Sequence, residues 1–182
     1  MGQASHVGYA APVAISQPPG WGAAAFTPGS PGDNGSVRVT MLLCDHAVVA
    51  EGKLYINGGG WSVRPAAPMP MFLALKFDVP WDRAGRPIHI ELHLVDEDGH
   101  PVLRRPPAEA EGADPTPRPV VVAARLEVGR PTGLTPGAPV DAAVAIGIPP
   151  FPLPPARRYS WRLLVDGEQR EDWVVGFATR AE

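Results

Sequence analysis

Apolar and polar side chains alternate along most of the chain from Val37 onward. The alternation is clearest in residues 71–79 and 88–94, where every second side chain is apolar. A period of two places successive side chains on opposite faces of an extended strand, so one face of each segment is expected to be buried. No long window has helical apolar spacing without a proline or glycine inside it, because the chain holds 24 prolines and 20 glycines. The sequence therefore predicts an all-β protein.

The expected strands are each bounded by proline, glycine or aspartate. They fall at residues 37–43, 54–56, 71–79, 88–94, 120–128, 140–148, 159–165 and 170–178. Because no crossover helix separates them, the predicted architecture is an antiparallel β-sandwich, immunoglobulin-like or similar, with a barrel as the alternative. The 182 residues suit one domain, residues 37–182, after a disordered tail, residues 1–36, that is rich in glycine, proline, alanine and serine.

The last two strands allow a prediction about register. Their large apolar side chains all occupy odd positions and must share one buried face: Tyr159, Trp161, Leu163, Val165, Trp173, Val175 and Phe177. A two-residue turn at Asp166 and Gly167 would pair odd positions with even ones. A three-residue loop, 166–168, is therefore expected, with Trp161 opposite Trp173.

Charge and cysteine content bear on compartment and partners. The net charge is -3 and the basic residues form no continuous stripe, so we expect no nucleic-acid partner. The single Cys44 cannot form an internal disulfide, which is typical of a reducing compartment. The first residues lack the features of a secretory signal, and no stretch approaches the roughly 18 apolar residues of a membrane helix. We therefore expect a cytoplasmic protein with no membrane partner.

Residues 58–60 are three consecutive glycines followed by Trp61. Prolines at 65, 68 and 70 exclude the helix that a phosphate-binding glycine loop needs behind it. The favoured interpretation is a bend, in which positive φ angles let the chain cross from one sheet to the other while Trp61 closes the end of the core. The alternative is a ligand-binding end, whose contact residues would be Tyr55, Gly58, Gly59, Gly60, Trp61 and Trp81.

Three further groups have metal-ligating side chains. His89, Glu91 and His93 share one strand face, but same-face neighbours lie about 6.5 Å apart along a strand, so three hardly share one metal. Residues 44–46, Cys-Asp-His, point in alternating directions. Residues 96–99, DEDG, begin like a calcium loop but lack its later ligands, and a hairpin turn explains them. No motif of a serine hydrolase or a zinc protease is present, so we expect no catalytic residue, no metal and no cofactor.

Several short stretches of the sequence occur together in a known family. They are LLCD at 42–45, GKLY at 52–55, GGGW at 58–61, VPWD at 79–82, LVDEDG at 94–99, VGRPTGL at 128–134 and YSWRLLVDG at 159–167. The chain resembles a widespread bacterial family of unknown function whose members begin near LLAD-A-V-GKLY-GGGW. Cys44 stands where alanine is expected, which argues against a metal or redox role there. The resemblance implies a compact β-sandwich over residues 37–182 and no activity or catalytic residue.

The expected function is that of a non-catalytic protein-interaction or structural module with an unknown protein as its partner. The expected contact surfaces are the tail and the proline-rich loops. The proline run at 148–155 is expected to be extended, either as a lead into the next strand or as a ligand for an aromatic groove. The alternative is a small-ligand or carbohydrate-binding module, or a minor enzyme, centred on residues 58–61.

Overall fold

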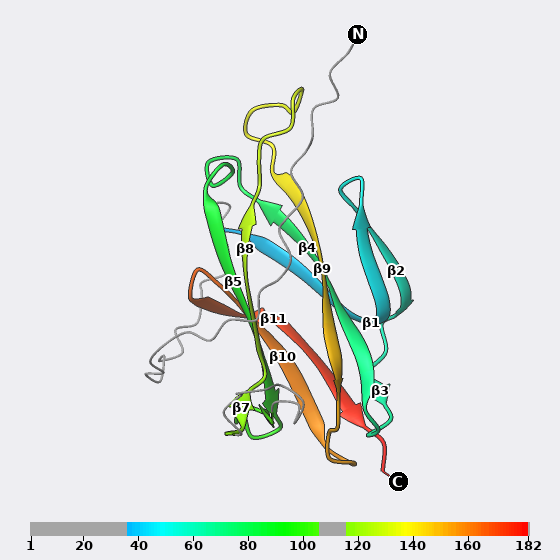
Figure 1. Cartoon of the computed structure of the whole chain (residues 1–182). Coiled ribbons are helices and arrows are strands. Elements are labelled where there is room, and N and C mark those ends of the chain that lie inside the picture. The colour runs from blue at the N-terminus through cyan, green and yellow to red at the C-terminus, as the bar shows by residue number, and fades with distance from the viewer. Residues whose placement is uncertain (1–35, 106–115, 182) are drawn as a thin grey trace.

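The computed structural model describes residues 36–105 and 116–181, in which every regular element is a strand (Figure 1). The first sheet has the order β2-β1-β4-β9, formed by β2 (Lys53–Gly59), β1 (Arg38–Ala50), β4 (Met69–Val79) and β9 (Val140–Phe151). The second has the order β3-β11-β10-β5-β8, formed by β3 (Val63–Arg64), β11 (Glu168–Thr179), β10 (Arg158–Val165), β5 (Pro87–Asp96) and β8 (Val121–Glu127). A small third sheet pairs β6 (Leu103–Arg104) with β7 (Arg118–Pro119).

All strand pairs are antiparallel except β3 with β11, which is parallel. The predicted antiparallel β-sandwich is therefore confirmed. The predicted tail, residues 1–36, lies outside the described residues apart from Ser36. In the part of the chain that the structure describes, no helix is long and apolar enough to span a membrane.

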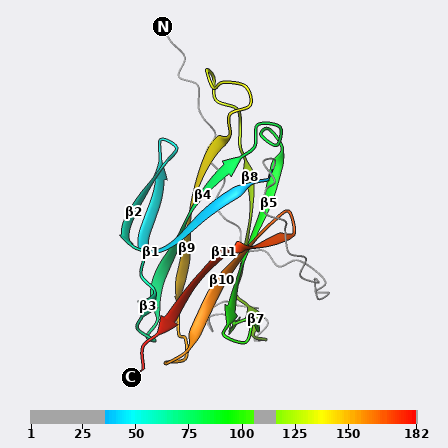
Figure 2. The ribbon, with the colours of Figure 1, turned by 180° about the vertical axis from the view of Figure 1, so that it is seen from behind.

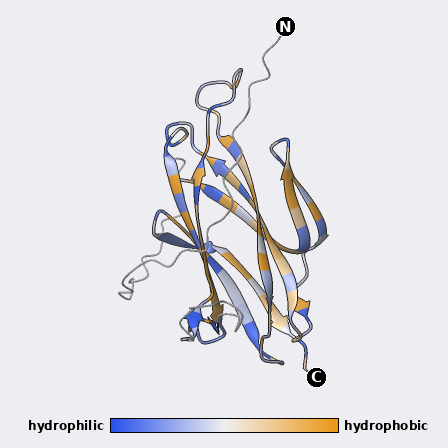
Figure 3. Cartoon of the chain, in the orientation of Figure 1, coloured by the Kyte–Doolittle hydropathy of each residue, from blue (hydrophilic) through white to orange (hydrophobic). Residues whose placement is uncertain are grey.

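The core lies between the two large sheets and follows the alternation in the sequence. On β4 the inward side chains are fully buried: Met71, Leu73, Leu75, Phe77 and Val79. On β5 the buried set is Ile88, Ile90, Leu92 and Leu94. Figure 3 shows apolar and polar bands succeeding one another along these strands. Each large apolar side chain removed from water stabilises the fold by about 1.5–3 kcal/mol, which is why the alternation fixes the inward face.

The hairpin between β10 and β11 differs from its prediction. Val165 pairs with Glu168, so the turn has two residues, Asp166 and Gly167, and the expected three-residue loop is wrong. Both turn residues have positive φ, 50° and 83°, as a tight hairpin turn requires.

An irregularity farther along the same hairpin restores the shared face. The register shifts between Arg162 and Leu164, so that Arg162 pairs with Val174 and Trp161 pairs with Val175 rather than with Trp173. Extra residues in β11 therefore turn an odd-to-even register into an odd-to-odd one. The prediction that odd positions of both strands face the core is confirmed, since Trp161, Trp173 and Phe177 are all buried.

The hairpin formed by β1 and β2 leaves the first sheet after Cys44. Up to Cys44, β1 pairs with β4 on one side, and beyond it the strand pairs only with β2. The hairpin then lies near the outer face of β4 and β9, and Figures 1 and 2 both show β2 as its outermost strand. A second, small apolar cluster forms beneath it: Cys44, Ala47 and Ala74, with Leu42, Leu54, Phe72 and Ala145 at its rim.

Small residues on the outer face make room for this hairpin. Ala74 pairs with Ala145, and Phe72 pairs with Gly147. A side chain at Gly147 would come within 3.0 Å of the Phe72 ring. Burial on this second face explains why β1 continues to Ala50, whereas the alternation in the sequence predicts a strand that ends at residue 43.

The proline run after Ile148 is part of the sandwich. β9 extends through two of the prolines to Phe151, and Phe151 and Leu153 are both buried in the core. Thr179 Oγ1 donates a hydrogen bond of 2.7 Å to the carbonyl oxygen of Pro154. The run therefore leads into β10, as one of the two expectations states, with Phe151 and Leu153 turned inward and the prolines exposed.

Candidate functional site

The three glycines carry the chain from the first sheet to the second. β2 ends at Gly59 in the first sheet, and β3 begins at Val63 in the second. Gly58 and Gly60 have φ angles of 59° and 85°, which L side chains rarely adopt. The N–H of Gly60 donates a hydrogen bond of 2.8 Å to the carbonyl oxygen of Leu43. The predicted bend is confirmed.

Trp61 follows the crossing and packs against the edge of the core. Its ring lies edge-on to Phe177, with 5.8 Å between ring centroids and an interplanar angle of 85°. The side chain is half-buried among core residues. Trp61 therefore closes this end of the sandwich.

The next residues of the chain hold an uncommon buried cation. Arg64 is only 2% exposed, and its Nη2 donates hydrogen bonds of 3.2 Å to the carbonyl oxygens of Ala67 and Met69. Its Nε donates to the carbonyl oxygen of Pro65 at 3.3 Å. Burial lowers the pKa of the Arg64 guanidinium, because the charged form loses water. This side chain fixes the loop between β3 and β4.

The six sequence-predicted contact residues lie on different parts of the fold. Tyr55 and the three glycines lie on the β1–β2 hairpin and its exit, and Trp61 packs inward. Trp81 follows the far end of β4, beyond Val79. Because Phe72 is the β4 residue beside the glycines, and seven residues separate it from Val79, the two places lie about 23 Å apart along the strand.

The ring of Trp81 has a local partner of its own. The guanidinium of Arg130 lies 4.9 Å from the ring centroid, and Nη2 of the same side chain donates a hydrogen bond of 2.9 Å to the Trp81 carbonyl oxygen. This arrangement is a cation–π contact between the loop after β4 and the loop after β8. Arg130 therefore covers one face of the Trp81 ring.

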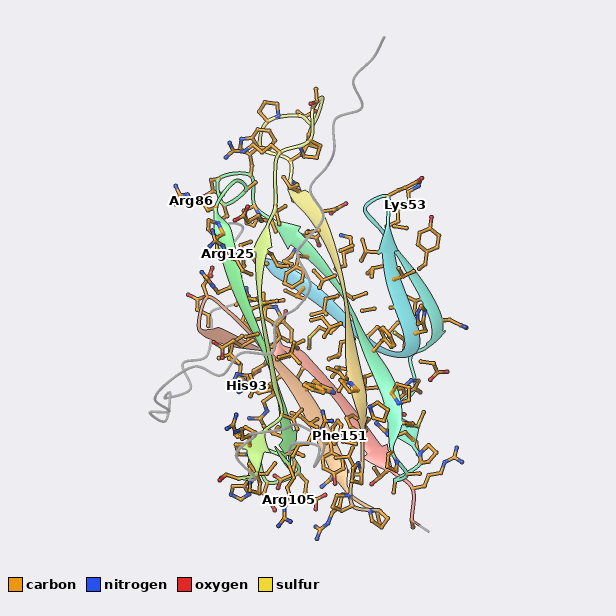
Figure 4. All side chains as sticks on the ribbon, viewed as in Figure 1. Lys53, Arg86, His93, Arg105, Arg125 and Phe151 are labelled. Atoms are coloured by element: carbon orange, nitrogen blue, oxygen red, sulfur yellow. The ribbon has the colours of Figure 1, made fainter. Side chains whose placement is uncertain are left out.

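The β1–β2 hairpin itself presents apolar side chains to solvent. Val48 is 47% exposed, and its cross-strand partner Tyr55 is 52% exposed. Ile56 is 42% exposed, and β2 is exposed along nearly its whole length. Lys53 marks the free end of this hairpin (Figure 4). Large side chains on an exposed strand are a feature of surfaces that meet another protein.

β2 is also a free strand edge. Among the residues that the structure describes, it is the end strand of the first sheet and pairs only with β1. The two-residue turn Glu51–Gly52, with φ angles of 51° and 72°, closes on the pair Ala50 and Lys53. The two residues of such a closing pair exchange two backbone hydrogen bonds. From there on, the N–H and C=O groups of successive residues point alternately toward the partner strand and away from it. Lys53, Tyr55 and Asn57 turn their backbone groups to β1, whereas Leu54 and Ile56 turn theirs outward.

The comparisons with known proteins identify a family. The model of a family of unknown function, DUF6941, matches residues 39–175. The chain belongs to this family. No curated protein and no solved structure matches the chain. The matched segment runs from β1 into β11, so it includes the hairpin edge, the glycine crossing and Arg64.

The metal-ligating groups of this DUF6941 chain are engaged in local contacts. His93 Nε2 lies 2.9 Å from Glu91 Oε2 on the outer face of β5. Asp96 Oδ1 accepts hydrogen bonds from the N–H groups of Asp98 at 3.0 Å and His100 at 2.8 Å. The sequence reading missed His100 as a companion of the two aspartates, although the ligand atoms of all three lie within 4.8 Å of one another. The two backbone hydrogen bonds make this loop a turn stabilised by Asp96, as expected.

In this DUF6941 chain Cys44 and His46 both lie against Phe72, whereas the Asp45 side chain lies against Gly58. Cys44 is fully buried, and burial raises the pKa of its thiol, to which the nearby charge of Asp45 adds. The Cys44 Sγ lies 3.6 Å from the carbonyl oxygen of Phe72, and the ring of His46 stacks on Phe72 at 4.9 Å. A buried, neutral thiol is inert toward metals and oxidants, so Cys44 is part of the packing beneath the hairpin.

Proposed function

We propose that this member of DUF6941 is a non-catalytic protein-interaction module that binds its partner by adding a strand to the edge of β2. The observation that carries this proposal is the outer edge of β2, which no other strand of the described chain pairs with and which is flanked by the exposed side chains of Val48, Tyr55 and Ile56. Backbone groups on a free edge supply the hydrogen bonds for an added strand, and alternate side chains supply the selectivity. A cytoplasmic location in a bacterium is part of the proposal, supported by the buried free Cys44 and by the sequence resemblance.

The hairpin is placed to offer this edge without disturbing the core. Its inner face rests on the small cluster of Cys44, Ala47 and Ala74, while Val48 and Tyr55 face away. Both strands of the hairpin are anchored at its base. β1 is held there by the pairing of Cys44 with Phe72, and β2 by the hydrogen bond from the N–H of Gly60 to the carbonyl oxygen of Leu43. An anchored strand loses little conformational entropy when it binds, which favours recognition at this edge.

The other three end strands of the two large sheets, β9, β3 and β8, carry features that oppose strand addition. β3 has only two residues, and β9 contains Pro149 and Pro150, which lack an N–H group. β8 carries the exposed charged side chains of Arg125 and Glu127. Short edges, proline and charge are the devices by which natural proteins prevent edge pairing. β2 has none of them beyond Lys53 at its first position.

The proposal is tested by removing one outward N–H group. In Ile56→Pro, proline replaces a residue whose N–H faces away from β1, so the hairpin keeps its own hydrogen bonds. The matched control is Ile56→Val, which keeps the N–H and an apolar side chain. Cross-linking in a lysate of the source organism, with the cross-links mapped by mass spectrometry, should place a partner on residues 53–57 of the wild type and Ile56→Val. Equal capture by Ile56→Pro would contradict strand addition.

A further inference from the structure

We propose that the strand added to β2 is β2 of a second copy of this chain, in an antiparallel pair around a two-fold axis through Tyr55. This inference rests on the proposed use of the β2 edge as a binding surface and names its partner. It is carried by three properties of the strand KLYINGG at residues 53–59: the order of its outward backbone groups, the side chains beside them and the position of its single charge.

The outward backbone groups match a second copy in only one register. Leu54 and Ile56 are the strand residues that turn their N–H and C=O outward. With the axis at Tyr55, Leu54 of one copy faces Ile56 of the other, and each such pair exchanges two hydrogen bonds. All outward groups of both residues are then satisfied in both copies.

Neighbouring registers fail on backbone conformation. An axis at Ile56 would set Leu54 opposite Gly58, whose φ of 59° lies outside the strand region. An axis at Leu54 would set Ile56 opposite Gly52, which is a turn residue with φ of 72°. The ends of the strand therefore select the Tyr55 register.

The same register joins the exposed apolar side chains. The two Tyr55 residues face one another as a non-hydrogen-bonded pair, the closer kind of cross-strand pair. Val48 lies beside Tyr55 on its own hairpin, so a row of Val48, Tyr55, Tyr55 and Val48 crosses the two copies on one face. On the other face Ile56 meets Leu54 of the second copy. The pair therefore joins apolar side chains on both faces. The exposed Val48, Tyr55 and Ile56 of each copy gain apolar neighbours from the other copy.

Charge permits this register as well. Lys53 is the one charged residue of β2, and the register sets it opposite Asn57 of the second copy. The two lysines lie four residues apart along the paired strands, about 13 Å. No like charges face each other, so the pair carries no electrostatic penalty of the kind that guards other edges.

A cysteine pair tests the axis directly. In a non-hydrogen-bonded pair the Cα atoms are about 4.5 Å apart, within disulfide reach, so oxidised Tyr55→Cys should form a covalent dimer in high yield. Lys53→Cys is the matched control, because its two copies would lie about 13 Å apart, beyond disulfide reach. A mixture of Lys53→Cys and Asn57→Cys should cross-link again. The native Cys44 does not interfere because it is buried.

Association in solution supplies the second test. Sedimentation velocity of the full chain from about 10 μM to about 1 mM should show a monomer–dimer equilibrium, since a contact confined to one edge is of the small, weak class. Ile56→Pro should be monomeric across this range, whereas Ile56→Val should dimerise. Tyr55→Lys and Tyr55→Glu should each be monomeric alone and should dimerise when mixed, because opposite charges then meet on the axis. Circular dichroism of each variant checks that the sandwich is intact.

The outcomes separate this inference from the proposed function. Efficient Tyr55→Cys dimers with no Lys53→Cys dimers, together with the restored Tyr55→Lys and Tyr55→Glu mixture, support the two-fold pair. A monomeric wild type at about 1 mM that still captures a different protein through residues 53–57 would overturn the second copy as partner and leave strand addition standing. A monomeric wild type with no edge-dependent capture would overturn both.

Discussion

The carboxylate of Asp45 lies directly against the backbone of Gly58. A Cβ atom built at Gly58 would come within 2.0 Å of Asp45 Oδ2 and 2.6 Å of its Cγ. The two residues belong to adjacent strands of the hairpin, on the pair that the regular register between β1 and β2 skips. Gly58 is therefore required twice, once by its φ of 59° and once by the side chain across from it.

This double requirement predicts a graded response to alanine. Gly58→Ala should lower the free energy of unfolding by about 2–4 kcal/mol, from the positive φ and the displaced carboxylate together. Gly52→Ala is the control, because Gly52 has a φ of 72° but no atom within 4 Å of its Cβ position. It should cost about 1 kcal/mol. Urea denaturation of both variants makes the comparison.

A double variant separates the two causes. Asp45→Ala removes Oδ2 and Cγ and leaves only the Cβ, 3.0 Å from the added atom. Gly58→Ala in the Asp45→Ala background should therefore cost little more than Gly52→Ala. An unchanged cost in that background would show that backbone strain alone makes Gly58 necessary.

Arg64 leads to a prediction about a buried charge. Arg64→Met should destabilise the protein by about 3 kcal/mol, since the carbonyl oxygens of Pro65, Ala67 and Met69 would lose their charged donor. Arg64→Lys should recover little, because an ammonium cannot reproduce the planar set of donors. The exposed Arg180→Met serves as a control and should stay within about 0.5 kcal/mol of wild type. Thermal and urea unfolding measure these differences. An Arg64→Met variant as stable as wild type would contradict the conclusion that Arg64 fixes the loop between β3 and β4.

Lys76 connects two carboxylates that face each other across β4 and β9. Asp78 pairs with Asp141, and Lys76 Nζ contacts Asp78 and lies 3.1 Å from Asp141 Oδ1. The hydrogen bond from Lys76 lowers the pKa of Asp78, and the hydrogen bond to Asp78 raises the pKa of Lys76. Because the folded state lowers the Asp78 pKa, this carboxylate stabilises the fold at pH values above its ordinary pKa. That stabilisation is lost as the pH falls through the lowered pKa. Because the folded state raises the Lys76 pKa, this ammonium group stabilises the fold at pH values below its ordinary pKa. That stabilisation is lost as the pH rises through the raised pKa.

Lys76→Met should therefore lower stability by about 1 kcal/mol or less at pH 7, because water screens these half-exposed groups. The difference from wild type should shrink as the pH falls below about 4, where the carboxylates that have lost Lys76 in the variant become protonated. The contact of Arg38 Nη2 with Asp78 Oδ2, at 3.6 Å, is present in both proteins. Lys53→Met, at the hairpin end, is the matched control and should show no such pH dependence. A difference that stays constant as the pH falls from about 5 to about 2 would mean that packing of the lysine stem, rather than charge, is lost.

The sandwich could be predicted from sequence because most strands bury only one face. In β4 and β5 the inward side chains are large and, apart from Phe72, the outward ones are polar or small, so the period of two is visible. The last part of β1 does not show this alternation, because Cys44 and Ala47 are buried on the outer face beneath the hairpin. Two-sided burial removes the alternation on which the strand prediction depends.

The register of the last hairpin and the site were less accessible to sequence reasoning. The shared face of Trp161 and Trp173 was predictable, but the extra residues in β11 that produce it leave no local signal. Apolar residues on both faces of 47–50 and 54–56 are the available sign of the exposed hairpin, but the alternation in the sequence predicts a strand only at 54–56.

Trp61, after the glycine crossing, and Trp161, in β10, provide a last prediction. Trp161 is fully buried at the centre of the second sheet, whereas Trp61 is half-buried and holds Phe177 edge-on. Trp161→Ala should cost about 4–5 kcal/mol and Trp61→Ala about 2–3 kcal/mol, in proportion to the apolar surface that each ring removes from water. Trp61→Phe should recover most of the loss, since a phenyl ring preserves the edge-to-face contact. Urea denaturation of the three variants measures the order. If Trp61→Ala is as stable as wild type, the ring does not close the core, and it is then free to stack on a ligand.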